Sequence, residues 1–449
     1  MDQPAPTTSP NGPITGRGGQ AIDISFENRS DRLIGLGFVN GLLRVVTLGL
    51  YSFWAKTEVR RKLWSFTRLN GEPLEYTGTG KELCLGFLIM FMVIAIPAML
   101  TGVAVAIAFA GNRTALTIYQ FLAYLVFFLL IGNALYRARR YRLSRTRWRG
   151  IRGALVGRPG AYGWMYFWTL AVPIVAIAAM ALAASWATGP AVGGVFVAVG
   201  CIAALWVLPW RANALQGRIT RETRFGDTPL TYDGAAGPLY KRYLYAWFGS
   251  AVAILAGVGA TFGWVLSAKT FEAWRDLGES PAASEIATVV GIWIAVAASI
   301  AVITASYRAS QFKHFAHHTA IGASRFRSEV NGTGLAWLVV SNWLLAALGL
   351  ILGAIAGGAL IYAFGAAPQL TDLETGRAEI TAVQIAIALV PIIVLSTMAT
   401  TFAQFRSARY FLSRLKLDGP VDLAGIAQSA DAGPKRGEGL AQVFDLDAF

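Results

Sequence analysis

The distribution of apolar residues is the feature of this sequence that most constrains its fold. Eight uninterrupted apolar stretches reach about 20 residues, the length that a helix needs to cross the hydrocarbon core of a bilayer. They are residues 83–110, 115–136, 163–187, 191–210, 243–268, 286–306, 335–364 and 380–405. Hydrophobic residues make up 55% of the chain and charged residues only 14%. The sequence therefore predicts a mainly α, polytopic bundle of transmembrane helices.

A ninth apolar stretch, residues 33–54, has two interpretations. If it spans the membrane, it places the N-terminus on the far side. If it is re-entrant, it bends near Gly49 and returns, because its length at about 1.5 Å per residue suffices to cross once and not twice. A lipid-facing Arg in mid-span costs roughly 2.5–3.5 kcal/mol. Arg44 therefore favours the shallow, re-entrant interpretation, with its side chain reaching lipid phosphates.

The distribution of charge predicts the topology. Pairing the eight spans into four hairpins gives far-side loops 111–114, 188–190, 269–285 and 365–379, which hold four Lys or Arg and seven Asp or Glu. Most other Lys and Arg lie between the hairpins and after the last one. Loops rich in Lys and Arg remain in the cytoplasm, so we expect the basic segments and the C-terminus to be cytoplasmic. The net charge of +14 then requires no nucleic-acid partner.

Each hairpin is followed by a repeated pattern of a basic helical stretch, a glycine and a short alternating segment. The glycines are Gly71, Gly150, Gly226, Gly322 and Gly419. We interpret each as the C-cap of its helix and the alternation as a strand, which fits the second copy, at Ile151 and Leu155, least well. Unpaired strands are costly near hydrocarbon. We therefore expect the strands, with a first one from residues 21–38, to form one small cytoplasmic β-sheet.

The tails differ in composition from the rest of the chain. We expect residues 1–21 and 427–449 to be disordered, and residues 22–426 to form a single membrane domain built from repeats. The two cysteines, Cys84 and Cys201, both lie in apolar spans, so neither a disulfide framework nor a CxxC motif is present.

A family signature lies in the ambiguous stretch. The residues Asn-Gly-Leu-Leu at 40–43, Thr-Leu-Gly-Leu-Tyr at 47–51 and Trp-Ala at 54–55 resemble the N-x-L-L, T-L-G-[IL]-Y and W-A elements of the YjgN-like family. The resemblance covers most of residues 22–425, and Phe53 departs from it where a Pro is expected. It implies a multi-pass protein of the bacterial inner membrane with a domain of unknown function. It brings no substrate, cofactor or catalytic residue.

The histidines are weak candidates for a metal site. His314, His317 and His318 are close on one helical face, and imidazoles so spaced are able to share a metal ion. The nearest carboxylate in the sequence is Glu329, so we favour a partly charged interfacial helix face. We expect neither a metal nor another cofactor.

Other polar features point away from catalysis and proton-coupled transport. The eight spans contain no Asp or Glu, which such transporters usually require, and no catalytic triad or carboxylate pair is recognisable. We therefore expect no enzymatic activity. The glycines at 349, 353 and 357, and at 37 and 41, allow close helix packing within the chain or in a homo-oligomer.

Arginines near the ends of the spans carry the functional hypothesis. Arg forms bidentate bonds with phosphate, and basic residues beside spans hold anionic headgroups. The candidate contacts are Arg44, Arg60, Arg61, Arg137, Arg140, Arg145, Arg211, Arg308 and Arg406. The hypothesis is a scaffold or interaction protein whose partners are membrane lipids. The alternative is a transporter or channel for a small molecule or lipid, with a polar cavity near Asn133, Asn342 or Gln384.

Overall fold

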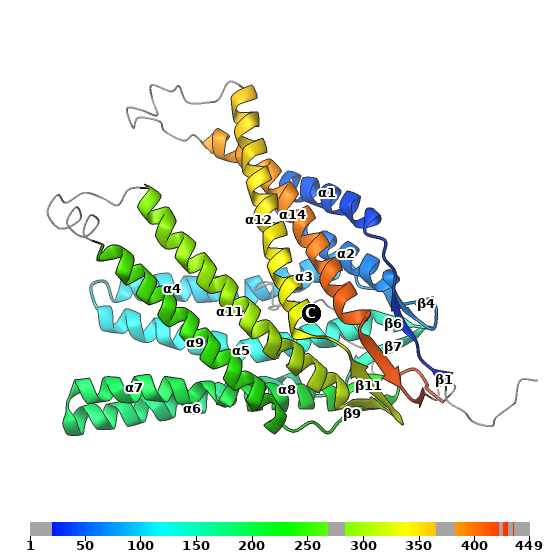
Figure 1. The fold of residues 1–449 in the computed structure, drawn as a ribbon, viewed down its shortest axis with the longest axis horizontal. Coiled ribbons are helices and arrows are strands. Elements are labelled where there is room, and N and C mark those ends of the chain that lie inside the picture. The colour runs from blue at the N-terminus through cyan, green and yellow to red at the C-terminus, as the bar shows by residue number, and fades with distance from the viewer. Residues whose placement is uncertain (1–19, 268–282, 365–381, 422–424, 430–433, 435–449) are drawn as a thin grey trace, which may run out of the picture.

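The computed structural model describes residues 20–267, 283–364, 382–421, 425–429 and 434. The helices are α1 (Asp31–Val46), α2 (Ser52–Phe66), α3 (Gly80–Met90), the π-helical η1 (Phe91–Ala95), α4 (Ile96–Ala108), α5 (Arg113–Arg145), α6 (Pro159–Thr188), α7 (Pro190–Leu205), α8 (Val207–Glu222), α9 (Gly237–Val265), α11 (Ala283–His317), α12 (Gly332–Ala363) and α14 (Ala382–Leu412). The strands gather at one end of the molecule, and the long helices extend away from them (Figure 1).

The described residues contain eight helical segments that are long and apolar enough to cross a membrane. Helices α3, η1 and α4 form one of these segments, Gly80–Ala108, and α7 and α8 form another, Pro190–Glu222. Each includes most of one predicted apolar stretch, so the prediction of a mainly helical chain with eight membrane-capable helices is confirmed for the described residues. Several continue past the apolar stretch toward the strands. Helix α5, for example, runs to Arg145. Successive long helices pack along each other, α6 on α7, α9 on α11 and α12 on α14.

The ambiguous N-terminal stretch is two helices and not one. Helix α1 ends at Val46, and α2 begins at Ser52 after a turn in which Leu48 and Gly49 have φ values of 51° and 91°. Strand β2 (Ile24–Phe26) precedes α1 and pairs with β3 (Thr67–Leu69), which follows α2. The two helices therefore leave the strands and return to them.

Four of the basic helices, α2, α5, α8 and α11, pass directly into a β-hairpin. Thr67, Thr146, Thr223 and Thr319 lie where these four helices end, and each hydroxyl donates to the carbonyl oxygen four residues earlier, at 2.7–3.1 Å. These bonds satisfy carbonyls that a helix end leaves free. The β-branched Thr then starts the strand.

The predicted glycine C-caps are wrong. Gly71, Gly150, Gly226 and Gly322 lie in hairpin turns, and Gly419 lies at the bend between β12 and β13, which pair with different strands; φ at the five glycines is between 56° and 109°. Hairpin turns of two residues require positive φ, which glycine adopts without strain. The same conformational demand arises at a helix C-cap, so the sequence pattern fits both.

The remaining strands are β1 (Gln20–Ala21), β4 (Glu72–Pro73), β5 (Glu75–Tyr76), β6 (Thr146–Trp148), β7 (Ile151–Leu155), β8 (Thr223–Phe225), β9 (Thr228–Tyr232), β10 (Thr319–Ile321), β11 (Ser324–Ser328), β12 (Leu415–Asp418) and β13 (Pro420–Val421). An antiparallel sheet of eight strands runs in the order β12-β11-β10-β9-β8-β7-β6-β5. Strands β2, β3 and β4 form a second sheet, and β1 pairs with β13. Strands from successive repeats therefore pair, including the second repeat, whose β7 is five residues long.

The sheets curve around an apolar core. Side chains from β2 and from every strand between β7 and β13 meet in one cluster: Ile24, Ile151, Phe225, Leu230, Ile321, Phe326, Leu417 and Val421, with Ile22 and Ile426. Strand β12 also lies beside β2. A flat sheet would not bring these side chains together, so we infer that the strands roll around a common centre.

Part of the C-terminal segment completes this core. Ile426 is buried in the cluster, and Ala427 exchanges hydrogen bonds with Asp227 in the turn between β8 and β9. The backbone N–H of Arg152 donates to Gln428 Oε1 at 3.0 Å. Residues 427–429 of the expected tail are thus attached to the sheet, as Gln20–Ala21 are through β1. Residues 1–19, 430–433 and 435–449 of the tails lie outside the described residues.

The glycine stripes serve packing within the chain. A Cβ on Gly41 of α1 would lie 2.8 Å from Val394 Cα, and one on Gly353 of α12 would lie 2.7 Å from Ile392 Cα. Both facing residues belong to α14. Small residues at this spacing let helix backbones approach closely. Helices α1 and α12 therefore both pack against α14, α1 at Val394 and α12 at Ile392.

Replacing Gly353 by alanine is therefore expected to lower the melting temperature in detergent by several degrees. The added Cβ overpacks the α12–α14 contact, which typically costs about 1–3 kcal/mol. Gly358→Ala is the matched control, because a Cβ there meets nothing within 4 Å and the change gains about 1 kcal/mol of helix propensity. Equal melting temperatures for the two variants would refute the packing role of Gly353.

Candidate functional site

The junction between the spanning helices and the sheet holds most of the charged side chains near the membrane. We define this junction as the sheet-side ends of α3, α5, α6, α8, α9, α11, α12 and α14, with the loops that join them to strands. Its acids and its cations behave differently. The described acids at the helix ends are bound within the protein, whereas several cations face outward.

Two glutamates of the junction are held by tyrosine and arginine. Glu82, in the first turn of α3, accepts from Tyr141 at 2.6 Å and from both Nε and Nη2 of Arg145, at 3.1 and 2.8 Å. The Arg145 guanidinium also lies over the Tyr141 ring. The carboxylate additionally suits the positive end of the helix dipole. Glu82 is therefore a structural link between the first and second spans.

Glu222 has the same role at the end of α8. It accepts from Tyr136 of α5 at 2.6 Å and from Arg218 of its own helix at 3.1 Å. A Cβ on Gly157 would meet the ends of both the Glu222 and the Tyr136 side chains, so a larger residue there would displace this contact. This contact joins α5, α8 and the start of α6 without leaving a free acid.

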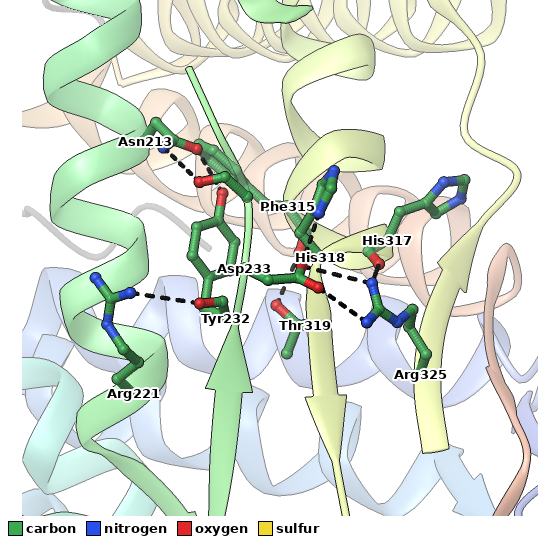
Figure 2. A network of polar contacts seen from close by, with 10 residues as sticks. Asn213, Arg221, Tyr232, Asp233, Phe315, His317, His318, Thr319 and Arg325 are labelled. Atoms are coloured by element: carbon green, nitrogen blue, oxygen red, sulfur yellow. Dashed lines mark hydrogen bonds and ion pairs between the residues drawn. The ribbon is translucent and has the colours of Figure 1, made fainter. Parts of the chain in front are cut away.

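A third acid organises a polar network between β9 and α11 (Figure 2). Asp233 lies 2.7 Å from His318 Nδ1 and accepts from Arg325 of β11 at 2.9 Å. The preceding residue, Tyr232, donates to Asn213 of α8 at 2.6 Å. These contacts attach two successive repeats, α8–β8–β9 and α11–β10–β11, to each other.

The network shifts the ionisation of its members. Hydrogen bonds from His318 and Arg325 lower the pKa of Asp233 below its ordinary value of 3.8. Burial, with a smaller contribution from the nearby Asp233 charge, raises the pKa of Tyr232 to about 12. At neutral pH the network therefore contains an ionised Asp233 and a protonated Tyr232.

The three histidines do not converge. The rings of His314 and His318 are 4.5 Å apart, whereas the carbonyl of His317 accepts from Arg325 (Figure 2). The carboxylate that contacts this cluster is Asp233, through His318, although it is distant in the sequence. Glu329, the nearest carboxylate in the sequence, pairs instead with Lys416. Within the described ranges no three His, Cys, Asp or Glu side chains are grouped as a metal ion would require.

Several of the predicted lipid-contact arginines are already bound to protein. Their partners are Ser52 and Thr397 for Arg44, Tyr76 for Arg60, Gly78 for Arg61, Glu82 for Arg145, Thr169 and the Tyr166 ring for Arg211, and Ser341 for Arg406. These side chains position helices. Arg140 is half-buried, while Arg137 and Arg308 are exposed.

Exposed cations that the sequence analysis did not single out lie at the same level. Together with Arg137 and Arg308 they form a set of seven, which we call the outward cations: Lys81, Arg137, Arg158, Lys241, Arg242, Arg308 and Lys313. No ion pair joins any of them to a carboxylate in the part of the chain that the structure describes. The signal was available in the sequence, since Lys81, Lys241, Arg242 and Lys313 lie in the first or last turns of a spanning helix and Arg158 directly precedes one.

A pocket of about 390 Å³ opens in the junction between α9, α11 and α12. It is lined by Arg242, Ser306, Ala309, Ser310, Lys313, Val330, Asn331, Gly332 and Thr333. The polar residues proposed for a mid-membrane cavity lie elsewhere. Asn133 donates to the Leu129 carbonyl of its own helix, and Asn342 of α12 donates to Ser407 of α14.

Comparisons with known proteins agree with this architecture. A family model described as "Bacterial protein of unknown function (DUF898)" matches residues 21–443. One curated relative, "Inner membrane protein YjgN" of Salmonella typhimurium, is 29% identical over 83 residues. That alignment covers 18% of this chain and 21% of the relative, so this chain matches about a fifth of the relative's length. No solved structure matches.

Asp233→Asn tests the network of Figure 2. We expect a small loss of stability near neutral pH, below about 1 kcal/mol because the pair is exposed. A lowered folded pKa adds stability above the ordinary carboxyl pKa and loses it as pH falls through the folded value. The melting-temperature difference from wild type should therefore close below pH 3.8. Asp418→Asn, whose partner Arg327 is 3.9 Å away, should show a smaller difference throughout.

Proposed function

This chain belongs to the DUF898 family of bacterial proteins of unknown function, and from this premise we propose that it is an inner-membrane scaffold that binds anionic lipid. It is a multi-pass membrane protein, with eight membrane-capable helices. The name of the Salmonella relative supports the inner membrane as its location. The scaffold itself is a rolled sheet that holds four helical hairpins in place and presents cations to headgroups.

The charge distribution supports a cytoplasmic sheet and C-terminus. The outward cations all lie at the sheet ends of the spans, whereas Arg113 is the one Lys or Arg at the opposite ends within the described ranges. Basic residues beside spans remain on the cytoplasmic side. The sheet, the junction and the residues after α14 therefore face the cytoplasm in this proposal.

The helix pair α1–α2 then enters the membrane from the cytoplasm and returns. Its two ends are joined by the β2–β3 pairing, and its tip carries exposed apolar side chains, with Leu48 95% and Val46 77% exposed. Exposed apolar groups of this size favour hydrocarbon over water. Arg44, near the tip, is bound by Ser52 and Thr397, which offsets part of its desolvation.

The outward cations are the observation that carries the proposal. Seven exposed Lys and Arg lie at the level where spans leave hydrocarbon, and within the described residues none of them forms an ion pair with a carboxylate. Juxtamembrane cations gain about 1 kcal/mol each from anionic headgroups. Lipid phosphates are the anions present at that level, so they are the natural counter-charges.

The bound acids support a structural role over a catalytic one. Glu82, Glu222 and Asp233 each have two protein partners, and a general acid or base needs access to a substrate proton. Their tyrosine and arginine contacts instead link one repeat to the next. We propose that this chain catalyses no reaction.

Reversing two outward cations is expected to weaken lipid binding. In Arg137→Glu/Arg158→Glu, we expect fewer anionic phospholipids to remain bound after detergent extraction, with an apparent affinity about thirtyfold weaker because each of the two contacts contributes about 1 kcal/mol. Native mass spectrometry of the purified protein, with and without added phosphatidylglycerol, gives the measurement.

The matched control is Arg113→Glu/Arg224→Glu, which changes the net charge equally. Arg113 lies at the opposite end of α5 from Arg137, and Arg224 is exposed on β8 of the sheet. Its lipid content should equal that of wild type. If both double variants retain lipid like wild type, or both lose it alike, the outward cations are not a lipid-binding surface.

A further inference from the structure

The pocket between α9, α11 and α12 combines two unpaired cations with hydroxyl groups. Arg242 enters it from α9 and Lys313 from α11, while Ser306 and Ser310 line its α11 wall. The lining contains no carboxylate. Neither cation forms an ion pair with any acid in the ranges that the structure describes. The pocket lining therefore carries two positive charges and no negative one, with Glu329 acting on Lys313 only at longer range than an ion pair, and it suits an anion.

Nearby cations of the same sheet end have partners, which makes this contrast informative. Lys416 binds Glu329 at 2.7 Å and Arg325 binds Asp233 at 2.9 Å. Lys313 lies on α11, one turn before His317, and its side chain lines the pocket. The two sheet cations are paired with acids, whereas, among the described residues, Arg242 and Lys313 are not.

Backbone groups add donors to the same space. The first turn of α12 lines the pocket at Gly332 and Thr333, and the first N–H groups of a helix have no partner within it. The Asn331 side chain caps Gly334 N–H, and Tyr410 of α14 donates to the Asn331 carbonyl at 2.9 Å. A Cβ on Gly332 would lie 2.8 Å from Ser306 Oγ, so glycine permits this close approach.

An apolar surface begins where the pocket ends. On α12, Trp337 and Leu344 follow Thr333 on the same helical face, and they are 68% and 61% exposed. On α9, Tyr245 follows Arg242 by one turn and is 66% exposed. A ligand with its anionic group in the pocket would meet apolar side chains on two of the surrounding helices. This arrangement fits an amphiphile better than a free anion.

We propose that the pocket binds the phosphate of one anionic phospholipid, with Arg242 and Lys313 as its charged contacts and the acyl chains along α9 and α12. This inference rests on the proposed function and makes it specific, because it assigns one tightly held lipid to one site. The pocket volume of about 390 Å³ lies within the usual range for small-ligand sites. The outward cations elsewhere hold exchangeable lipid.

The test compares Arg242→Glu/Lys313→Glu with wild type in native mass spectrometry during stepwise removal of lipid by detergent. Wild type should retain one anionic phospholipid after the others are lost. The variant should lose it, with an apparent affinity at least tenfold weaker. Arg242→Gln/Lys313→Gln gives the same comparison without charge reversal, and circular dichroism and melting temperature verify that both variants fold.

Two further arms separate the possible outcomes. Arg137→Glu/Arg158→Glu should retain the last lipid while losing the exchangeable ones. If the pocket variants retain the last lipid and Arg137→Glu/Arg158→Glu loses the exchangeable ones, the pocket inference is wrong and the proposed function stands. If no variant changes lipid content, both are wrong.

The second arm identifies the source of the phosphate. Wild type in nanodiscs of neutral lipid is titrated with inorganic phosphate, and in parallel with phosphatidylglycerol, while its melting temperature is followed. A shift with phosphatidylglycerol alone, abolished in Arg242→Gln/Lys313→Gln, supports the lipid site. A shift with inorganic phosphate of equal size would overturn the lipid assignment in favour of a soluble phosphate compound.

Discussion

The pairing of strands between successive repeats is the constraint on which the rest of this structure depends. Four of the basic helices end at a side-chain cap, such as Thr146 on the Arg142 carbonyl, and in each of them the chain continues at once into a hairpin. An unpaired hairpin beside a membrane would expose backbone groups that are expensive to desolvate. Pairing with the next repeat satisfies them, and it also determines where the next membrane hairpin must start.

This arrangement accounts for the separation of charges in the junction. Acids close to the sheet, such as Glu82 and Glu222, are enclosed because neighbouring helices meet there and supply tyrosine and arginine donors. Cations on the outer faces of the same helices have no such neighbours within the described residues. In our proposal, lipid headgroups supply the missing partners. The α9–α11–α12 pocket holds the phosphate of one particular lipid between Arg242 and Lys313, whereas the other outward cations hold exchangeable lipid.

Local sequence signals predicted the spans and the positions of the turns, but not the contacts between repeats. Apolar length alone identified all eight helices. Gly150 marked a turn, although its role as a hairpin turn and not a helix cap depends on pairing with a distant strand. The Glu82–Arg145 pair joins residues 63 positions apart, and the pocket joins three helices. Neither has a local signal. Arg44 and Arg211 were assigned to lipid from their charge, whereas tertiary packing gives them protein partners.

The side of the membrane that the sheet faces tests this account most directly. Single cysteines at Ala323, in the turn between β10 and β11, and at Thr114, at the start of α5, are both exposed. They would be introduced with Cys84 and Cys201 replaced by alanine. A membrane-impermeant maleimide applied from the periplasmic side should label Thr114→Cys in intact spheroplasts and Ala323→Cys only after permeabilisation. Labelling of Ala323→Cys without permeabilisation would place the sheet outside and contradict the account.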